Sequence, residues 1–240
     1  MHRNTIPGCD KKGGHKPDVA GEAGLTDIDD AGRVRPKPAT RGEQRRRAFL
    51  DAAADVFLEQ GYEAASVNEV VRRAGGSLAT LYAQFGNKDG LFQAVIEDIT
   101  ERYSDAILDA ADTDLPLEQG LQHIGEQFLG SILRPRAIAF TRVMIGEGRK
   151  IPEMMERWIL SGPERLRSAV SEFLLSRGCK EGLHLTEEEA DLAGSFFCEM
   201  VRSRHQYRAF AYDEYPMDEA EARRHVAMAV RFFLDGVRAR

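Results

Sequence analysis

The sequence predicts an all-α protein with an N-terminal three-helix domain and a larger helical C-terminal domain, about nine helices in all. From Arg41 onward, apolar residues recur at the three-and-four spacing of amphipathic helices, and no convincing alternating strand pattern or internal repeat interrupts them. Capping residues, glycines and prolines divide these apolar stripes into pieces of helical length. Each piece is therefore treated as a separate helix.

Three short helices are expected over residues 41–90. The first carries one apolar stripe, made of Phe49, Ala52, Ala53, Val56 and Phe57. Gly61 can end this helix because glycine adopts positive φ without steric cost. Ser66 and Glu69 have the spacing of a capping box, which would open a second helix of about two turns. Gly75 provides a sharp exit, so a third helix is expected over residues 77–85.

The helices that follow are longer. Asn87 can cap a helix that runs to about Ala111 and links the two domains. Two more capping boxes are expected, one at residues 161–164 and one at residues 186–189. Six more helices are expected in the C-terminal domain. Their ranges are Pro116 to about Leu133, 137–147, 151–160, Ser161 to Arg177, Thr186 to about Tyr207, and Pro216 to about Val237.

The composition divides the chain into three parts. Residues 1–40 are rich in Gly, Pro, Asp and Lys, so we expect a disordered extension, either a solvated tail or a basic arm that reaches DNA. Residues 41–90 form the first domain and residues 91–240 the second. The net charge of -6 comes from the C-terminal domain. Residues 1–92 carry 14 Lys and Arg against 13 Asp and Glu, whereas the remaining residues carry 19 Lys and Arg against 26 Asp and Glu.

Composition and motifs also argue against several classes of protein. No apolar run is long enough to cross a bilayer and no secretory signal is recognisable, so we expect a cytoplasmic protein without a membrane partner. The sequence has no G-x-S-x-G, H-E-x-x-H, phosphate-binding glycine loop or C-x-x-C motif. We therefore expect no enzyme activity, catalytic residue, cofactor or metal.

The third helix has the properties of a recognition helix. Leu81 and Phe85, four residues apart, would face the core, whereas a tyrosine, a threonine and a glutamine would point outward. In a helix-turn-helix motif such a helix lies in the DNA major groove, where its N-terminal residues meet base edges and its hydroxyl groups meet phosphates. Lys88, just beyond it, can also pair with a phosphate.

The pattern resembles the DNA-binding domain of the tetracycline-repressor (TetR/AcrR) family of bacterial regulators. The resemblance covers about 50 residues. It rests on the stripe from Phe49, Gly61-Tyr62, Ser66, Ala74-Gly75, Ser77, Thr80-Leu81-Tyr82, Phe85, Asn87-Lys88 and Leu91. It implies a DNA contact set of Arg45, Ser66, Ser77, Leu78, Ala79, Thr80, Tyr82, Ala83, Gln84 and Lys88.

Within this set, the resemblance implies phosphate or sugar contacts for Thr80, Tyr82 and Lys88 and base contacts for residues 77–79. The chain departs from the common family pattern at Gly76, Leu78, Ala79, Ala83 and Gln84, which leaves the operator sequence open. Leu78 could contact a thymine methyl group or pack against the neighbouring helix. Residues Arg45 to Arg47 could form a solvated basic turn or contact phosphates.

The resemblance implies a C-terminal domain that binds a small molecule. Residues 142–158 are similar to a common variant of the family. Residues that would surround a cavity are Phe92, Ile96, Tyr103, Phe128, Phe140, Met144, Trp158 and Phe173, although most apolar residues at helical spacing are core. Possible polar anchors are Arg142, Glu147, His123 and Glu126.

The last two helices are expected to form a homodimer interface. Their apolar faces, which one small domain would struggle to cover, are made of Leu192, Phe196, Met200, Val226, Val230, Phe233 and Val237. Two-fold symmetry would allow two recognition helices to read a palindromic operator in double-stranded DNA. The expected function is a transcriptional repressor released by a small, mainly apolar or aromatic effector. The alternatives are a regulator that responds to a metal or through the Cys198 thiol, and a helical partner-binding protein without DNA affinity.

Overall fold

A computed structural model describes residues 40–212, 215 and 217–238. The disorder expected for residues 1–40 therefore concerns a segment that lies outside the described residues, apart from Thr40. The chain divides into two compact units, Met1–Gln44 and Arg45–Arg240. In the first, Thr40 and Glu43 begin the first helix with a reciprocal pair of hydrogen bonds between the backbone amide of each residue and the side chain of the other.

The prediction of an all-α fold is confirmed: helices, turns and short connections make up the described residues. The helices are α1 (Arg41–Ala64), α2 (Val67–Ala74), α3 (Leu78–Phe85), α4 (Lys88–Ala111), α5 (Leu117–Ile132), α6 (Pro135–Glu147), α7 (Pro152–Ile159), α8 (Arg165–Phe173), α9 (Glu187–Ala211) and α10 (Glu219–Arg238). Two π-helical segments, η1 (Leu160–Glu164) and η2 (Leu174–Gly178), follow α7 and α8 without a break. None of the helices in this part of the chain has the length and apolar character of a transmembrane span.

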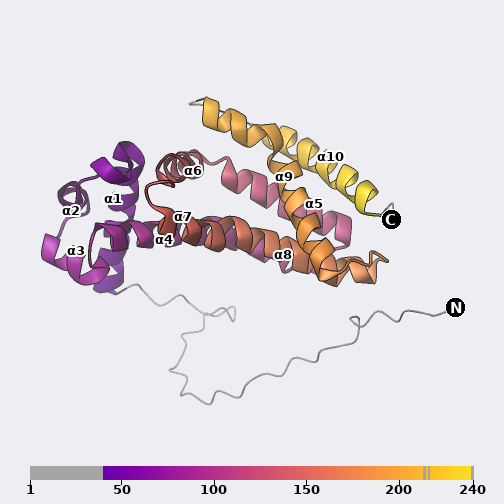
Figure 1. The fold of residues 1–240 in the computed structure, drawn as a ribbon, viewed down its shortest axis with the longest axis horizontal. Coiled ribbons are helices and arrows are strands. Elements are labelled where there is room, and N and C mark those ends of the chain that lie inside the picture. Colours follow the sequence, from indigo (N-terminus) through magenta and orange to yellow (C-terminus); the bar gives the residue numbers. More distant parts are fainter. Residues whose placement is uncertain (1–39, 213–214, 216, 239–240) are drawn as a thin grey trace, which may run out of the picture. The chain divides into compact units, whose positions relative to one another are not determined.

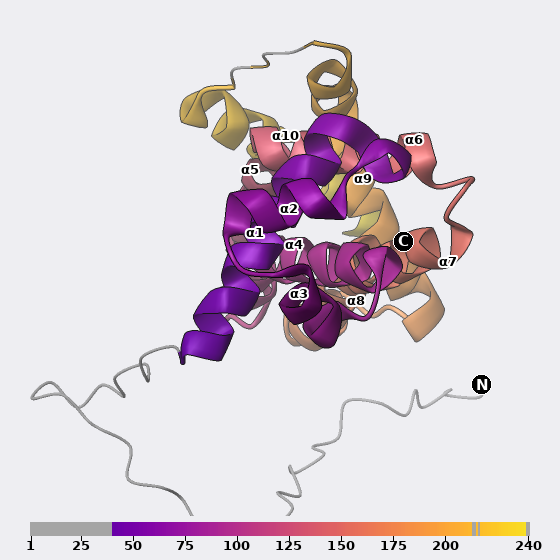
Figure 2. The same cartoon turned by 90° about the vertical axis from the view of Figure 1, so that its left-hand side faces the viewer.

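Helix α4 connects the two ends of the Arg45–Arg240 unit. Helices α1, α2 and α3 gather at one end, which Figure 2 shows from the front, and α5, α8, α9 and α10 lie beyond them (Figure 1). Helix α4 packs against α3 near its start and against α5, α7, η1 and α8 further along. One continuous helix therefore belongs to both groups.

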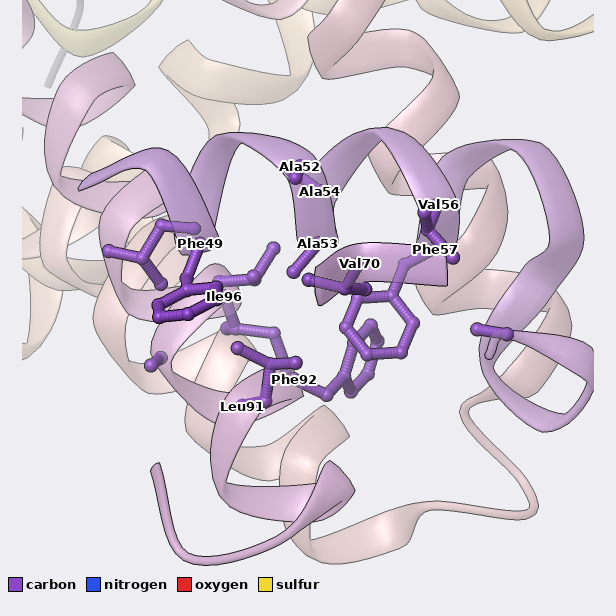
Figure 3. Close-up of a cluster of buried hydrophobic side chains, with 14 of the residues drawn as sticks. Phe49, Ala52, Ala53, Ala54, Val56, Phe57, Val70, Leu91, Phe92 and Ile96 are labelled. Atoms are coloured by element: carbon purple, nitrogen blue, oxygen red, sulfur yellow. The ribbon is translucent and has the colours of Figure 1, made fainter. Parts of the chain in front are cut away.

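The first hydrophobic core fixes α1, α2 and α3 to the start of α4. Figure 3 shows the α1 stripe facing Val70 of α2 and Leu91, Phe92 and Ile96 of α4. The Phe92 ring lies 4.7 Å from the centre of the Phe57 ring and 4.8 Å from that of Tyr62. Aromatic contacts at this distance add to the free energy gained by burial alone.

The second hydrophobic core lies among α5, α8, α9 and α10. Val226, Val230 and Phe233 of α10 are buried there, and the Phe233 ring packs edge-on against Phe197 of α9 at 5.3 Å. The prediction that these three α10 side chains need a second copy of the chain to cover them is wrong, because α5 and α9 already cover them within one chain.

The structure confirms one predicted capping box and contradicts two. Thr186 and Glu189 form both reciprocal bonds at the start of α9. Ser66 occupies the N-cap position of α2 but makes no capping bond, and the Glu69 carboxylate, which would complete the box, binds Arg72 and Arg73. No helix begins at residues 161–164, since α7 continues there into η1.

Candidate functional site

The turn between α2 and α3 depends on two glycines. Gly75 and Gly76 have φ of 71° and 111°, values that residues with a side chain rarely adopt. A Cβ atom at Gly76 would lie 3.1 Å from Cζ of Phe49, so the turn also packs closely against α1. The Arg45 guanidinium closes the turn by donating to the carbonyl of Ala74 at 3.3 Å. The turn thus fixes the direction in which α3 leaves α2.

One face of α3 is anchored and the other is free. Leu81 and Phe85 are buried, and the Phe85 ring packs edge-on against Phe49 at 6.3 Å. The predicted contact residues Ser77, Ala79, Thr80, Tyr82 and Ala83 are exposed. Helix α3 therefore presents a tyrosine and two hydroxyl residues on a short helix whose position is fixed from behind.

Ser77 differs from its predicted place as the first helical residue. It is the N-cap of α3, and its Oγ accepts from the backbone amide of Thr80 at 3.1 Å and lies 2.8 Å from the Thr80 hydroxyl. This pair stabilises the N-terminal end of α3. Leu78 and Gln84 are half-buried, and the Gln84 Oε1 atom is enclosed without a hydrogen-bond partner among the described residues.

The cations around α3 fall into two groups. Arg45 and Arg46 are exposed, and the Arg46 guanidinium lies 4.8 Å above the Phe85 ring. Arg47 instead pairs with Asp98 of α4 at 2.5 Å, so it is held away from the α3 surface. Arg72 and Arg73 bind Glu69, and their hydrogen bonds lower the pKa of that carboxyl group to about 2. One group of cations is therefore exposed and the other is held in ion pairs. The sequence could not distinguish exposed from paired cations because the pairing partners lie on other turns and helices.

Lys88 lies beside the recognition helix but is already bound. Its Nζ donates to the backbone carbonyl of Glu63 at 2.8 Å and lies 5.1 Å from the centre of the Tyr62 ring. Burial and a hydrogen bond to Asp89 raise the pKa of Tyr62 to about 12, which keeps the hydroxyl protonated as a donor. An ammonium group has three donors, so Lys88 retains capacity for a phosphate oxygen.

A cavity of about 360 Å³ lies among α4, α5, α6, α7, η1, α8 and α9. Four of the eight residues predicted for a ligand site line it, namely Tyr103, Phe128, Phe140 and Trp158. The other four are core residues, the alternative that the sequence left open for them. Phe92, Ile96 and Met144 lie in the first hydrophobic core and Phe173 lies in the second. Apolar spacing alone does not distinguish a core side chain from a cavity wall.

None of the four predicted polar anchors lines this cavity. Arg142 donates to the carbonyl of Ala209, Glu147 pairs with Lys150, and His123 and Glu126 line a shallower surface pocket. The polar residues that do line it were missed, because they belong to no motif and come from separate helices: Thr100, Ser104, Ser131, Thr141, Glu164, Arg167, Ser195, Glu199, Arg202 and Gln206.

Two family profiles match the chain. The C-terminal domain of AefR-like transcriptional repressors matches residues 119–236, and the bacterial regulatory proteins of the tetR family match residues 49–95, which include α2, α3 and the turn between them. The chain belongs to the TetR family. Members of this family are DNA-binding transcriptional regulators, and neither profile describes an enzyme.

Curated relatives of the TetR type match parts of the chain. The HTH-type transcriptional repressor ComR of Escherichia coli is 44% identical over 59 residues, which are 25% of this chain and 28% of ComR. The HTH-type transcriptional regulator SrpR of Pseudomonas putida is 25% identical over 138 residues, 58% of this chain and 63% of SrpR. Each match thus covers less than two thirds of the relative's length.

Solved structures of the TetR family share the whole fold. A regulator from Mesorhizobium loti superposes with a TM-score of 0.73 at 24% identity, over 82% of this chain and 98% of that chain. The flavonoid-responsive regulator FrrA superposes with a TM-score of 0.66 at 24% identity, over 80% of this chain and 96% of that chain. At these identities the likeness is one of fold.

In this TetR-family chain, charged side chains join α1 to the helices that surround the cavity. Besides the Arg47–Asp98 pair, Arg102 of α4 binds Asp51 of α1 at 3.0 Å. Arg136 of α6 binds Asp55 of α1, also at 3.0 Å. Arg102 and Arg136 each neighbour a residue of the cavity wall. These three ion pairs, here called the α1 ion pairs, connect the cavity wall with the domain that carries α3.

Helices α9 and α10 lie side by side (Figure 1). Both helices carry exposed apolar side chains. Of the residues predicted for an interface, Leu192 and Phe196 are 53% and 56% exposed, and Met200 and Val237 are half-buried. Met228 and Phe232 of α10, which were not among the predicted residues, are 44% and 55% exposed beside them. They lie off the apolar stripe of α10, which packs against the core of its own chain.

Proposed function

We propose that this TetR-family chain acts as a homodimer that binds a palindromic operator through α3 and represses transcription. A small, mainly apolar or aromatic molecule that enters the cavity would release the DNA. One observation carries the proposal: α3 is held rigidly by Leu81 and Phe85 while its opposite face, with Thr80 and Tyr82, is exposed. Operator binding is in keeping with the cytoplasmic location expected from the sequence.

The proposed DNA contacts divide by chemistry. Thr80, Tyr82 and Lys88 offer donors to phosphate oxygens, and so does Arg45, whose guanidinium uses one of its five donors on Ala74. The Ser66 hydroxyl group makes no capping bond, so it is also available to the DNA backbone. The remaining contacts, which would meet bases or flank those that do, are Ser77, Leu78, Ala79, Ala83 and Gln84.

The proposed release runs along α4. This helix begins at Lys88 beside α3, and its later turns carry Thr100 and Tyr103 in the cavity wall. A ligand that displaces this wall would shift α4 and, through the α1 ion pairs, the whole helix-turn-helix domain. The two α3 helices of a dimer would then lose the spacing of about one DNA turn that a palindrome requires.

A thiol-responsive regulator is the second candidate. Cys198 lines the cavity, but its burial raises the pKa of the thiol to about 12. Because the thiolate is the reactive form, a thiol that stays protonated is a poor redox sensor. Replacing Cys198 by Ser would abolish the response of a thiol switch and would leave a small-molecule response in place.

The proposal is tested by DNA binding. Fragments from the region upstream of the gene that encodes this chain would be mapped by footprinting to find the protected palindrome. Tyr82→Ala should then lower affinity for the operator and for unrelated DNA to a similar degree, because a phosphate contact is independent of sequence. Tyr212→Ala, which removes another exposed tyrosine, is the matched control. Unchanged operator affinity in Tyr82→Ala would contradict the docking.

A further inference from the structure

Two of the serines that line the cavity have hydroxyl groups without a partner among the described residues. Ser104 of α4 and Ser131 of α5 both line it and are 8% and 4% exposed. Neither hydroxyl group makes a hydrogen bond with a described residue, and neither oxygen is fully enclosed, so both are open to the cavity. Thr100, one helical turn before Ser104, likewise carries an Oγ1 atom without a partner in the described chain.

Other helical serines of the same domain behave differently. The Ser171 hydroxyl donates to the carbonyl of Arg167 four residues earlier at 3.0 Å, and the Ser195 hydroxyl donates to that of Asp191 at 3.2 Å. This back-bonding is the ordinary way in which a serine inside a helix satisfies its hydroxyl group. Ser104 and Ser131 are therefore the serines of the cavity wall that remain available to a bound molecule.

The charged residues of the cavity wall are already neutralised. Arg167 binds Glu164 and Asp191, and Arg202 binds Glu199. A carboxylate ligand would have to replace one of these partners. A neutral ligand would leave the pairs intact, so the wall favours neutral molecules.

The rest of the wall sets the size and the shape of the ligand. Phe128, Phe140 and Trp158 provide flat apolar surfaces, and the Phe140 and Trp158 rings meet edge-on at 6.4 Å. The volume of about 360 Å³ is near the lower end of the range for small-molecule sites. One ring or two fused rings would fit such a space better than a long chain.

We propose that the effector is a neutral aromatic molecule with a hydroxyl or carbonyl oxygen at one edge, and that Ser104 and Ser131 bind this oxygen. This assignment rests on the proposed function, because it names the ligand of the cavity that would release the DNA. Ser104 and Ser131 would then select for the polar group, while the aromatic residues hold the ring.

Three compounds with one ring system test the assignment: 1-naphthol, naphthalene and 1-naphthoate. Their affinities for the full-length protein would be measured by isothermal titration calorimetry. We expect 1-naphthol to bind about three- to tenfold more tightly than naphthalene for each hydrogen bond gained, and naphthoate to bind most weakly. Tightest binding by naphthoate, or no binding by any of the three, would overturn the assignment.

Serine variants show whether these hydroxyl groups cause the preference for 1-naphthol over naphthalene. Ser104→Ala combined with Ser131→Ala should lower the affinity for 1-naphthol to nearly that of naphthalene and leave naphthalene binding unchanged. Ser176→Ala, outside the cavity wall and with its hydroxyl group already bonded to the carbonyl of Phe173, should change neither affinity. An unchanged preference for 1-naphthol in the double variant would overturn the assignment.

Operator binding, measured on the same samples, separates this inference from the proposed function. DNA binding together with tightest binding by naphthoate would leave the regulator function standing and overturn the ligand class. If the three compounds bind in the expected order but the protein does not bind DNA, the ligand class stands and the regulator function is overturned.

Discussion

At the scale of single residues, the turn before α3 depends on Gly76. Replacement by Ala forces a side chain into φ of 111° and places its Cβ 3.1 Å from Phe49. We expect Gly76→Ala to lower the free energy of unfolding by about 2 to 3 kcal/mol, from backbone strain and overpacking together. Gly86→Ala is the control, because Gly86 has φ of 78° but nothing within 4 Å of an added Cβ. Urea denaturation of both variants measures the difference, and equal losses would contradict the role of Phe49.

His205 should make stability depend on pH. Its buried ring bonds the Tyr215 hydroxyl at 2.7 Å, beside Ser203, whose φ of 38° marks a kink in α9. The surrounding charged and titratable groups are His225, Arg204, Glu221 and Arg208. Burial, and secondly the charge of His225, lower the pKa of His205 below its ordinary value of 6.5.

The sign of the effect follows from proton uptake. As pH falls below 6.5 the unfolded chain binds a proton that folded His205 resists, so the free energy of unfolding decreases, whereas above 6.5 this contribution is absent. Urea denaturation at about pH 8 and about pH 5.5 should show a smaller decrease for His205→Gln than for the unaltered protein. Equal decreases would contradict the prediction.

At the scale of elements, the sequence predicted those helix boundaries that are determined by nearby residues. The span of α2, the end of α4 at Ala111 and the Thr186 cap follow from capping residues and apolar spacing within a few turns. The helix start expected at Ser161 failed because α7 continues through the π-helical η1 with Pro163 inside it. Packing of η1 against α4 and α8 overrides the local signal there.

The functional residues likewise divide into those that lie within one segment, which the sequence predicts, and those that come from separate helices, which it does not. The recognition helix was predictable because its anchors and exposed residues alternate within one short segment. The cavity was only half predictable, since residues such as Ser104 and Ser131 come from different helices and only the tertiary fold brings them to one wall. The α1 ion pairs likewise join residues about 50 to 80 positions apart, beyond any local pattern.

The junction of α3 and α4 should be sensitive to one methyl group. A Cβ at Gly90 would lie 2.1 Å from the backbone carbonyl oxygen of Phe85, the last residue of α3. The backbone cannot rotate aside as a side chain can, so Gly90→Ala must displace α3 from α4. We expect operator affinity to fall by about tenfold or more, measured by fluorescence anisotropy with a labelled operator. Gly130→Ala on α5, with open space around its Cβ, should have no effect.

At the scale of the whole molecule, the single helix α4 connects the recognition helix with the cavity. Residues 88 and 104 are separated by about 24 Å along an α-helix, so a small tilt at the cavity becomes a larger displacement beside α3. Such a displacement affects affinity only when the other half of a palindrome is held at a fixed distance. The proposed release by a ligand therefore requires a dimer.

The exposed face of α9 and α10 provides the test of that requirement. Charges placed there by Phe196→Asp together with Phe232→Asp would have to be buried without a partner in a dimer, which is strongly unfavourable. We expect the double variant to sediment as a folded monomer in analytical ultracentrifugation, with helical circular dichroism retained because both side chains are exposed in one chain. Its operator affinity should fall by about a hundredfold or more, since each monomer binds one half-site alone. Leu160→Asp, at a residue that is 57% exposed on η1, should remain dimeric and bind normally. A double variant that stays dimeric would place the interface elsewhere, and a monomer with full operator affinity would contradict the need for two recognition helices.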